Sequence, residues 1–156
     1  MFCQKLTDPL EDNINTELTT SSQGEVISVS ETVMYCQNFN QMKGASKMQQ
    51  IFKKVNGCHY DVILATETNR TEDIKSEEVF GSRFNVFRSD RDLKLTVKES
   101  GGGVLIAVNA TLPSELLPTD KHAEFEDVWV KVLMKNEKHL FVSVYFPPDM
   151  AKKSFV

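Results

Sequence analysis

The strongest constraint on the fold is a strand–helix–strand pattern over residues 33–65. Residues 33–37 and 60–65 are short apolar runs, each as long as a buried strand. Large apolar residues between the two runs recur at intervals of three and four, as on one face of a helix. They are Met48, Ile51, Phe52 and Val55. A crossover of this kind joins parallel strands, so the pattern predicts a sheet with at least one parallel pair.

Both ends of this helix have sequence signals. Ser46 is followed three residues later by Gln49, which predicts a capping box at the first turn. Gly57 stands where a helix commonly ends in a residue with positive φ.

The rest of the body is rich in strand signals. Residues 83–88 alternate between apolar and polar side chains, and residues 104–108 form a continuous apolar run. Two further strands are predicted at residues 127–133 and 140–146, and the polar residues 135–138 between them favour an antiparallel hairpin. Together these patterns predict an α/β (α+β) domain with a mixed sheet.

The first thirty residues differ in composition from the rest. Residues 1–25 are rich in Thr, Ser, Asn and acids, which predicts a disordered leader over residues 1–30 and a folded body over residues 31–156. The apolar residues at 26, 27 and 29 leave open a short strand before the first main one. The leader carries five acids and one base, whereas the body carries 17 of each. No broad basic field therefore marks the chain as an electrostatic nucleic-acid binder.

Cysteine use and hydropathy suggest the cellular setting. Cys3, Cys36 and Cys58 are odd in number and show no disulfide or metal-ligand spacing. No apolar run resembles a secretion signal or a membrane span of about 18 residues. These features predict an intracellular protein, nuclear or cytoplasmic, that is not secreted and has no membrane partner.

Three polar residues end predicted strands. Asn38 and Glu67 follow the two strands joined by the helix, so both fall at the carboxyl edge of the sheet, where ligands bind. A carboxylate beside an amide can hold a hard divalent cation such as Mg²⁺. Tyr145 ends the last strand. Each residue also has an ordinary structural role open to it, as a turn residue, a surface acid or a core aromatic.

Two other features carry weaker signals. The glycines at 101–103 lack the helix and lysine of a phosphate-binding loop, so flexibility or close backbone approach explains them more simply. The two arginines of residues 88–92 can reach phosphate, but the neighbouring acids favour a solvated loop.

The order of several blocks along the chain resembles a known family. The blocks are YCQN at 35–38, YDVILATET at 60–68, FNVFRSDR at 84–91, SGGGVLIAV at 100–108, VWVK at 128–131 and VYFPP at 144–148. The series resembles the N-terminal half of the endonuclease/exonuclease/phosphatase superfamily. It is most similar to the apurinic-type endonuclease domain of non-LTR retrotransposons, and the resemblance covers residues 31–150.

This resemblance implies a fold and a chemistry. The fold is a DNase I-like four-layer α/β/β/α sandwich, and the activity is cleavage of phosphodiester bonds in DNA with Mg²⁺, or Mn²⁺ in its place. By the resemblance, Glu67 is a metal ligand and Asn38 helps to hold the metal and the phosphate. The Tyr145 hydroxyl approaches the scissile phosphate, and Asn40 matches a further polar position of some members.

The sequence also departs from the family. The second half of the family domain carries an Asp-x-Asn motif, which orients the attacking water, and an Asp-His pair, which contacts the phosphate. Neither motif occurs in this sequence. We therefore expect a truncated DNA-nicking endonuclease domain that is inactive alone. The alternative is a catalytically dead, transposon-derived remnant that binds nucleic acid or protein, and a third reading is phosphoinositide or sphingomyelin hydrolysis. Sheet surface left uncovered by the missing half predicts self-association.

Overall fold

The computed structural model describes residues 16–21, 24–29, 32–40, 42, 44–69, 75–91, 101–120 and 125–147. Within these residues lie nine strands, two α-helices and one 3₁₀ turn. Their bounds are β1 Thr16–Ser21, β2 Gly24–Val29, β3 Thr32–Asn38, α1 Ala45–Gly57, β4 Val62–Thr66, α2 Glu77–Phe80, the 3₁₀ turn Gly81–Arg83, β5 Phe84–Ser89, β6 Val104–Asn109, β7 Ser114–Leu117, β8 Glu126–Met134 and β9 Glu137–Tyr145.

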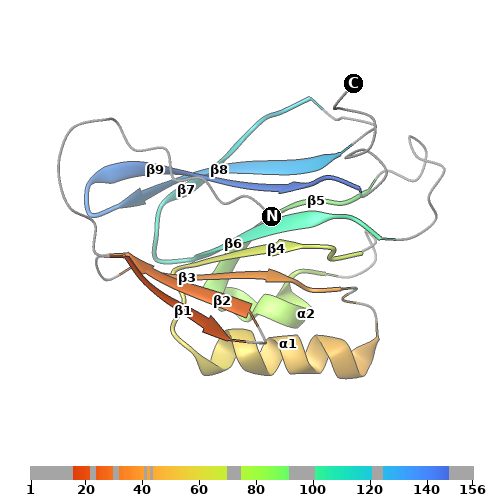
Figure 1. Ribbon diagram of the computed structural model, residues 1–156. Coiled ribbons are helices and arrows are strands. Elements are labelled where there is room, and N and C mark those ends of the chain that lie inside the picture. The colour runs from red at the N-terminus through yellow and green to blue at the C-terminus, as the bar shows by residue number, and fades with distance from the viewer. Residues whose placement is uncertain are drawn as a thin grey trace.

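The strands form two sheets that pack face to face. The larger sheet has the order β1-β2-β3-β4-β6-β5, and the smaller one has the order β7-β8-β9. Figure 1 shows α1 and α2 on one face of the larger sheet and the smaller sheet on its other face. The described residues thus build three layers, helices, sheet and sheet, of an α+β fold.

The predicted strand–helix–strand unit is confirmed. β3 and β4 pair in parallel from Met34 with Val62 to Asn38 with Thr66, and α1 connects them. All other strand pairs of the larger sheet are antiparallel in the described residues, so this sheet is mixed, as the sequence predicts. The β8–β9 hairpin is also confirmed. Its two turn residues, Lys135 and Asn136, have φ of 50° and 65°, as a turn matched to the strand twist requires.

The helix α1 ends at Gly57, as the sequence predicts, but the predicted capping box and the positive φ at Gly57 are wrong. The residue before the first turn is Gly44, with φ 95°, and no side chain caps the helix. Gly57 is the last residue of the helix, its φ is not positive, and Cys58 follows it in extended conformation. A glycine with positive φ is not needed at this end, because the guanidinium of Arg83 donates to the carbonyl oxygens of Asn56, at 3.1 Å, and Cys58, at 3.4 Å.

The short strand that the sequence leaves open at residues 26–29 is present as β2, and a further strand, β1, precedes it. β1 and β2 form an antiparallel hairpin, and β2 pairs with β3, within the stretch for which a disordered leader is predicted. Threonine and valine favour extended backbone, which fits both strands. Residues 1–15 of that leader lie outside the described residues.

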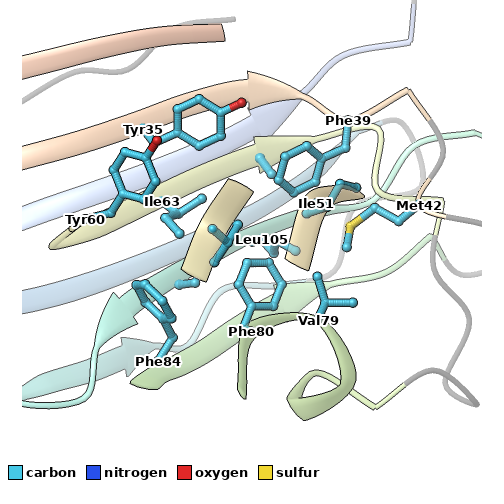
Figure 2. Packing of buried hydrophobic residues seen from close by; sticks show 13 residues of the cluster. Tyr35, Phe39, Met42, Ile51, Tyr60, Ile63, Val79, Phe80, Phe84 and Leu105 are labelled. Atoms are coloured by element: carbon cyan, nitrogen blue, oxygen red, sulfur yellow. The ribbon is translucent and has the colours of Figure 1, made fainter. Parts of the chain in front are cut away.

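Two clusters of buried side chains hold the layers together. The first fills the space between the helices and the larger sheet (Figure 2), and the second fills the space between the two sheets. β4 and β6 contribute to both, since alternate residues point to opposite faces. This double burial explains why these two strands are continuous apolar runs in the sequence.

The outer face of the smaller sheet carries apolar side chains. Val128, Val130 and Val132 of β8 are buried against the larger sheet, whereas Trp129 and Leu133 alternate with them and are more exposed. No described helix packs on this outer face (Figure 1). Nor does any helix in the described part of the chain combine the length and apolarity needed to cross a bilayer.

The chain has three tyrosines, and all of them resist ionisation. The rings of Tyr35 and Tyr60 stack with centroids 5.1 Å apart beneath the larger sheet (Figure 2). Burial, and then the neighbouring Tyr60 and Cys36, raise the pKa of Tyr35. Burial, and then a hydrogen bond with Cys58, raise the pKa of Tyr60 to about 12. The pKa of Tyr145 is raised as well.

Stability is therefore expected to fall above pH 10. Below the unfolded-state pKa of about 10 the tyrosines are protonated in both states, so their contribution is complete. As pH rises towards the folded-state values, the tyrosines of the unfolded chain ionise first, which stabilises the unfolded chain relative to the folded one. Urea midpoints measured from about pH 8 to 12 should fall above pH 10, and less steeply for Tyr35→Phe. A midpoint that stays constant across this range would contradict the prediction.

Candidate functional site

Asn38 and Glu67 lie at the same edge of the larger sheet. Asn38 is the last residue of β3 and pairs with Thr66, the last residue of β4, and Glu67 follows directly. Backbone bonding continues past the strand ends, because the Phe39 N–H donates to the Thr66 carbonyl at 2.9 Å. The carboxyl ends of the two strands are thus held side by side, as the sequence predicts.

The Asn38 side chain is oriented by its own turn. Its Oδ1 accepts a hydrogen bond from the backbone N–H of Asn40 at 2.8 Å. Asn40 has φ 44°, a conformation that asparagine tolerates well. Asn38 is exposed, so its amide faces the solvent at the sheet edge. Asn40 contributes to this edge through its backbone N–H.

Tyr145 reaches the same place from the other sheet. The Ser143 hydroxyl on β9 donates to the buried carbonyl of Ala65 on β4 at 3.3 Å, which fixes the two strands against each other. Tyr145 ends β9 and Glu67 follows the last residue of β4, and their side chains interact through a hydrogen bond. Burial, and then the negative charge and hydrogen bond of Glu67, raise the pKa of Tyr145, while the positive charge of Arg91 acts in the opposite direction. The two sheets therefore bring together two of the three predicted residues.

Glu67 has a backbone conformation that is unusual for its residue type. Its φ is 51°, in the left-handed region, which costs about 1–2 kcal/mol for a residue with a Cβ. The following segment holds it there: the Thr68 N–H donates to the Gly103 carbonyl at 3.2 Å and the Asn69 N–H to the Gly102 carbonyl at 2.8 Å. Strain of this kind persists where the surroundings determine the backbone, and it is concentrated at functional sites.

The triple glycine lets other groups approach its backbone closely. Gly102 and Gly103 have φ of 73° and 80°. A Cβ on Gly103 would lie 2.6 Å from the Thr68 hydroxyl oxygen, and one on Gly102 would lie 2.5 Å from the guanidinium carbon of Arg91. Of the two explanations that the sequence leaves open, close approach of the backbone is therefore the one that applies at these two positions.

Arg91 and Glu126 form an ion pair that the sequence patterns miss. Arg91 Nε lies 2.5 Å from Glu126 Oε1, and the two side chains are 8% and 10% exposed. The guanidinium carbon stands 5.8 Å from the centre of the Tyr145 ring. Glu126 is also the residue opposite Tyr145 in the β8–β9 ladder. The prediction of a solvated loop over residues 88–92 is therefore wrong at Arg91. The glycines at 101–103 were the one sequence signal for the buried position of Arg91. They indicate that a bulky group lies against their backbone, but not which residue it belongs to.

The donor set at this edge suits some metal ions and not others. Glu67 offers a carboxylate and Asn38 an amide oxygen, whereas the Glu126 carboxylate is engaged by Arg91. No cluster of three or more His, Cys, Asp or Glu side chains suited to a metal occurs among the described residues. Two oxygen ligands completed by water fit Mg²⁺, which keeps several waters, and do not fit Zn²⁺, which takes three or four protein ligands.

Comparison with known proteins gives no assignment. No protein-family model matches the chain, and no curated protein matches it with significant similarity. Its function must therefore be inferred from the residues and their arrangement.

Proposed function

We propose that this chain is part of a Mg²⁺-dependent phosphodiester hydrolase that nicks DNA, of the endonuclease/exonuclease/phosphatase type. One observation carries the proposal: Glu67 and Tyr145 come from different sheets and meet at the edge where Asn38 ends its strand. These are the three residues that the family resemblance selects.

Each residue has a role consistent with its surroundings. Glu67 and Asn38 would hold Mg²⁺, and the ion would neutralise charge developing on the phosphate. The Tyr145 hydroxyl, which bonds to the Glu67 carboxylate in this structure, would turn its single proton to a non-bridging phosphate oxygen once Mg²⁺ occupies that carboxylate. Arg91, beside the Tyr145 ring and paired with Glu126, positions the tyrosine.

The fold proposed for the whole domain is the four-layer sandwich. The three layers of the described residues supply one helix layer and two sheets. The exposed Leu133 and the half-buried Trp129 on the outer face of β8 support a second helix layer there, because such residues pack against another element when one is present. Without that cover, this face is where copies of the chain are proposed to associate.

A second candidate function is binding without cleavage. The sequence has neither an Asp-x-Asn motif nor an Asp-His pair. Among the residues with a described place at the site, the second carboxylate, Glu126, is occupied by Arg91. Without a positioned base, the rate of hydrolysis falls by at least about 10²–10⁴-fold. On this reading the chain binds DNA or a protein partner and cuts nothing.

Plasmid nicking distinguishes the two functions. Supercoiled plasmid is incubated with the chain and Mg²⁺, or Mn²⁺, and the nicked form is measured. For a hydrolase, Glu67→Gln should lower nicking at least about 100-fold, because the metal loses its carboxylate ligand at this edge. The matched control is Glu115→Gln, which removes a carboxylate from an exposed surface pair with Lys131 and should leave nicking unchanged.

Three results are informative. Nicking by the wild type and the control, but not by Glu67→Gln, supports the hydrolase. Nicking by all three proteins would contradict the assignment of Glu67. If none nicks, a gel-shift titration with the same plasmid decides the second candidate, since a binding remnant should still shift the DNA.

A further inference from the structure

A polar pocket opens at the far end of the larger sheet from Asn38 and Glu67. It has a volume of about 650 Å³ and lies where α1 ends, β5 begins and β6 ends. β4 and β6 run antiparallel, with Val62 opposite Val108 at the pocket end and Thr66 opposite Val104 at the other. At about 3.3 Å per residue, the pocket is roughly 15 Å from the candidate hydrolase site. It is therefore a separate surface feature.

The positive charge in this pocket is held in place. The Arg83 guanidinium donates to the carbonyl oxygens of Asn56 and Cys58 at the end of α1, and it stacks over the Phe84 ring, 5.5 Å from the ring centre. The carbonyl end of a helix is partly negative, and Arg83 more than offsets that partial charge. Two of its five N–H donors are engaged in these bonds. The remaining donors are preorganised for an oxyanion, which guanidinium groups bind well.

The other polar groups of the pocket are mainly donors. Asn109 Oδ1 accepts from the N–H and the hydroxyl of Thr111, at 3.1 and 2.9 Å, which fixes the amide and leaves its NH₂ group for a ligand. His59 and Ser82 add a ring N–H and a hydroxyl, and neither side chain bonds to another group in the described part of the chain. An imidazole can donate in its neutral form too, so this function does not require a protonated His59.

The lining contains no carboxylate from the described residues. The acidic residue nearest in the chain, Asp61, is bonded elsewhere, because its carboxylate accepts from the Val33 N–H at 2.9 Å. A pocket with one fixed guanidinium, several free donors and no such acid selects negative ligands over positive ones. The donors are spread over separate segments of the chain, which suits a tetrahedral anion with several oxygens better than a single chloride.

We propose that this pocket binds a phosphate group, with Arg83 as the charged ligand and Asn109, Ser82 and His59 as hydrogen-bond donors. The proposal does not depend on the hydrolase assignment at the opposite edge. Its ligand is either inorganic phosphate or the phosphate of a nucleotide, since both present the same oxygens.

The test is a titration of the ¹⁵N-labelled chain followed by NMR, with the Asn109 side-chain amide and the Arg83 Nε–H as reporters. Inorganic phosphate, adenosine 5′-monophosphate and adenosine are the three probes. The decisive variant is Asn109→Asp, which keeps the oxygen that accepts from Thr111 and replaces the free NH₂ donor with a charged oxygen. Arg83→Gln is avoided as the main variant because Arg83 also supports the end of α1. The control is Asn136→Asp, the same change in the β8–β9 turn.

We expect both phosphate probes to shift the reporters saturably and adenosine to leave them unmoved. Asn109→Asp, followed through the Arg83 Nε–H, should weaken phosphate binding at least tenfold, while Asn136→Asp should change it less than twofold. Tighter binding of the nucleotide than of inorganic phosphate identifies a nucleotide ligand, and equal binding identifies the free anion. The proposal is overturned if neither phosphate probe shifts the reporters, if adenosine shifts them as strongly, or if the two asparagine variants weaken binding equally.

Discussion

The Arg91→Met variant is expected to lose about 3–5 kcal/mol of the free energy of unfolding. Methionine fills much of the same space, but the Glu126 carboxylate, 10% exposed, then stays buried without its cation. Leaving a buried charge without its partner costs far more than the pair itself contributes. Since domains of this size have total stabilities of about 5–15 kcal/mol, the urea midpoint should fall by a large fraction.

Two further variants show whether the cost comes from the unpaired charge. In Arg91→Met/Glu126→Leu both charges are gone, and most of the lost stability should return, because an apolar pair of similar volume is often no worse than a buried ion pair. Lys131→Met removes a cation from the exposed pair with Glu115, whose side chains are 40% and 63% exposed, and should cost at most about 1 kcal/mol. If the double variant is as unstable as Arg91→Met, the loss comes from packing around the guanidinium and not from charge.

The second large effect is expected for Gly102→Ala, which should cost about 3 kcal/mol or more. Alanine at φ 73° costs about 1–2 kcal/mol in backbone strain. Its Cβ would also overlap the Arg91 guanidinium, with 2.5 Å to the central carbon, and overpacking of this kind adds about 1–3 kcal/mol. Urea denaturation measures the lost free energy of unfolding. The dependence of that free energy on urea concentration reports any change in the compactness of the folded state.

Two other glycines separate strain from overlap. Gly44 has φ 95°, but a Cβ at this position would have no other atom within 4 Å, so Gly44→Ala should show the strain alone, about 1–3 kcal/mol. Gly57 lies in α1 with open space around it, so Gly57→Ala should stabilise by about 0.5–1 kcal/mol. In the Arg91→Met/Glu126→Leu background, which has neither the guanidinium nor the unpaired carboxylate, Gly102→Ala should cost only the strain part, about 1–2 kcal/mol. Equal costs at Gly102 and Gly44 would show that Arg91 does not press on this glycine.

The sequence predicts those parts of the fold that depend on local periodicity. The apolar runs mark β4 and β6, and the polar stretch at residues 135–138 marks the hairpin, because strand burial and turn chemistry both leave local traces. The positive φ predicted for the C-terminal residue of α1 is wrong for the opposite reason. Arg83, 26 residues after Gly57 in the chain, supplies the hydrogen bonds there, and no local pattern reports a partner so distant.

The candidate site also has a part that the sequence predicts and a part that it does not. Asn38 and Glu67 follow predicted strands joined by one helix, so their meeting at one edge follows from the crossover rule. The contact of Glu67 with Tyr145 and the pairing of Arg91 with Glu126 depend on how one sheet is laid over the other. The way the sheets stack is determined by side-chain packing between them. No local sequence periodicity predicts this packing.

The hydrogen bond from Ser143 to Ala65 has a consequence for the order in which parts of the protein fold. It joins residues 78 positions apart in the chain, and the contact of Tyr145 with Glu67 is equally long-range. Closing so long a loop is slow, and its entropic cost must be met before the contact can form. On the ribosome, the segment that includes Glu67 is synthesised well before its tyrosine partner exists. The contact between Glu67 and Tyr145 therefore forms only when the last hairpin docks, and a change that loosens that hairpin should separate the two residues.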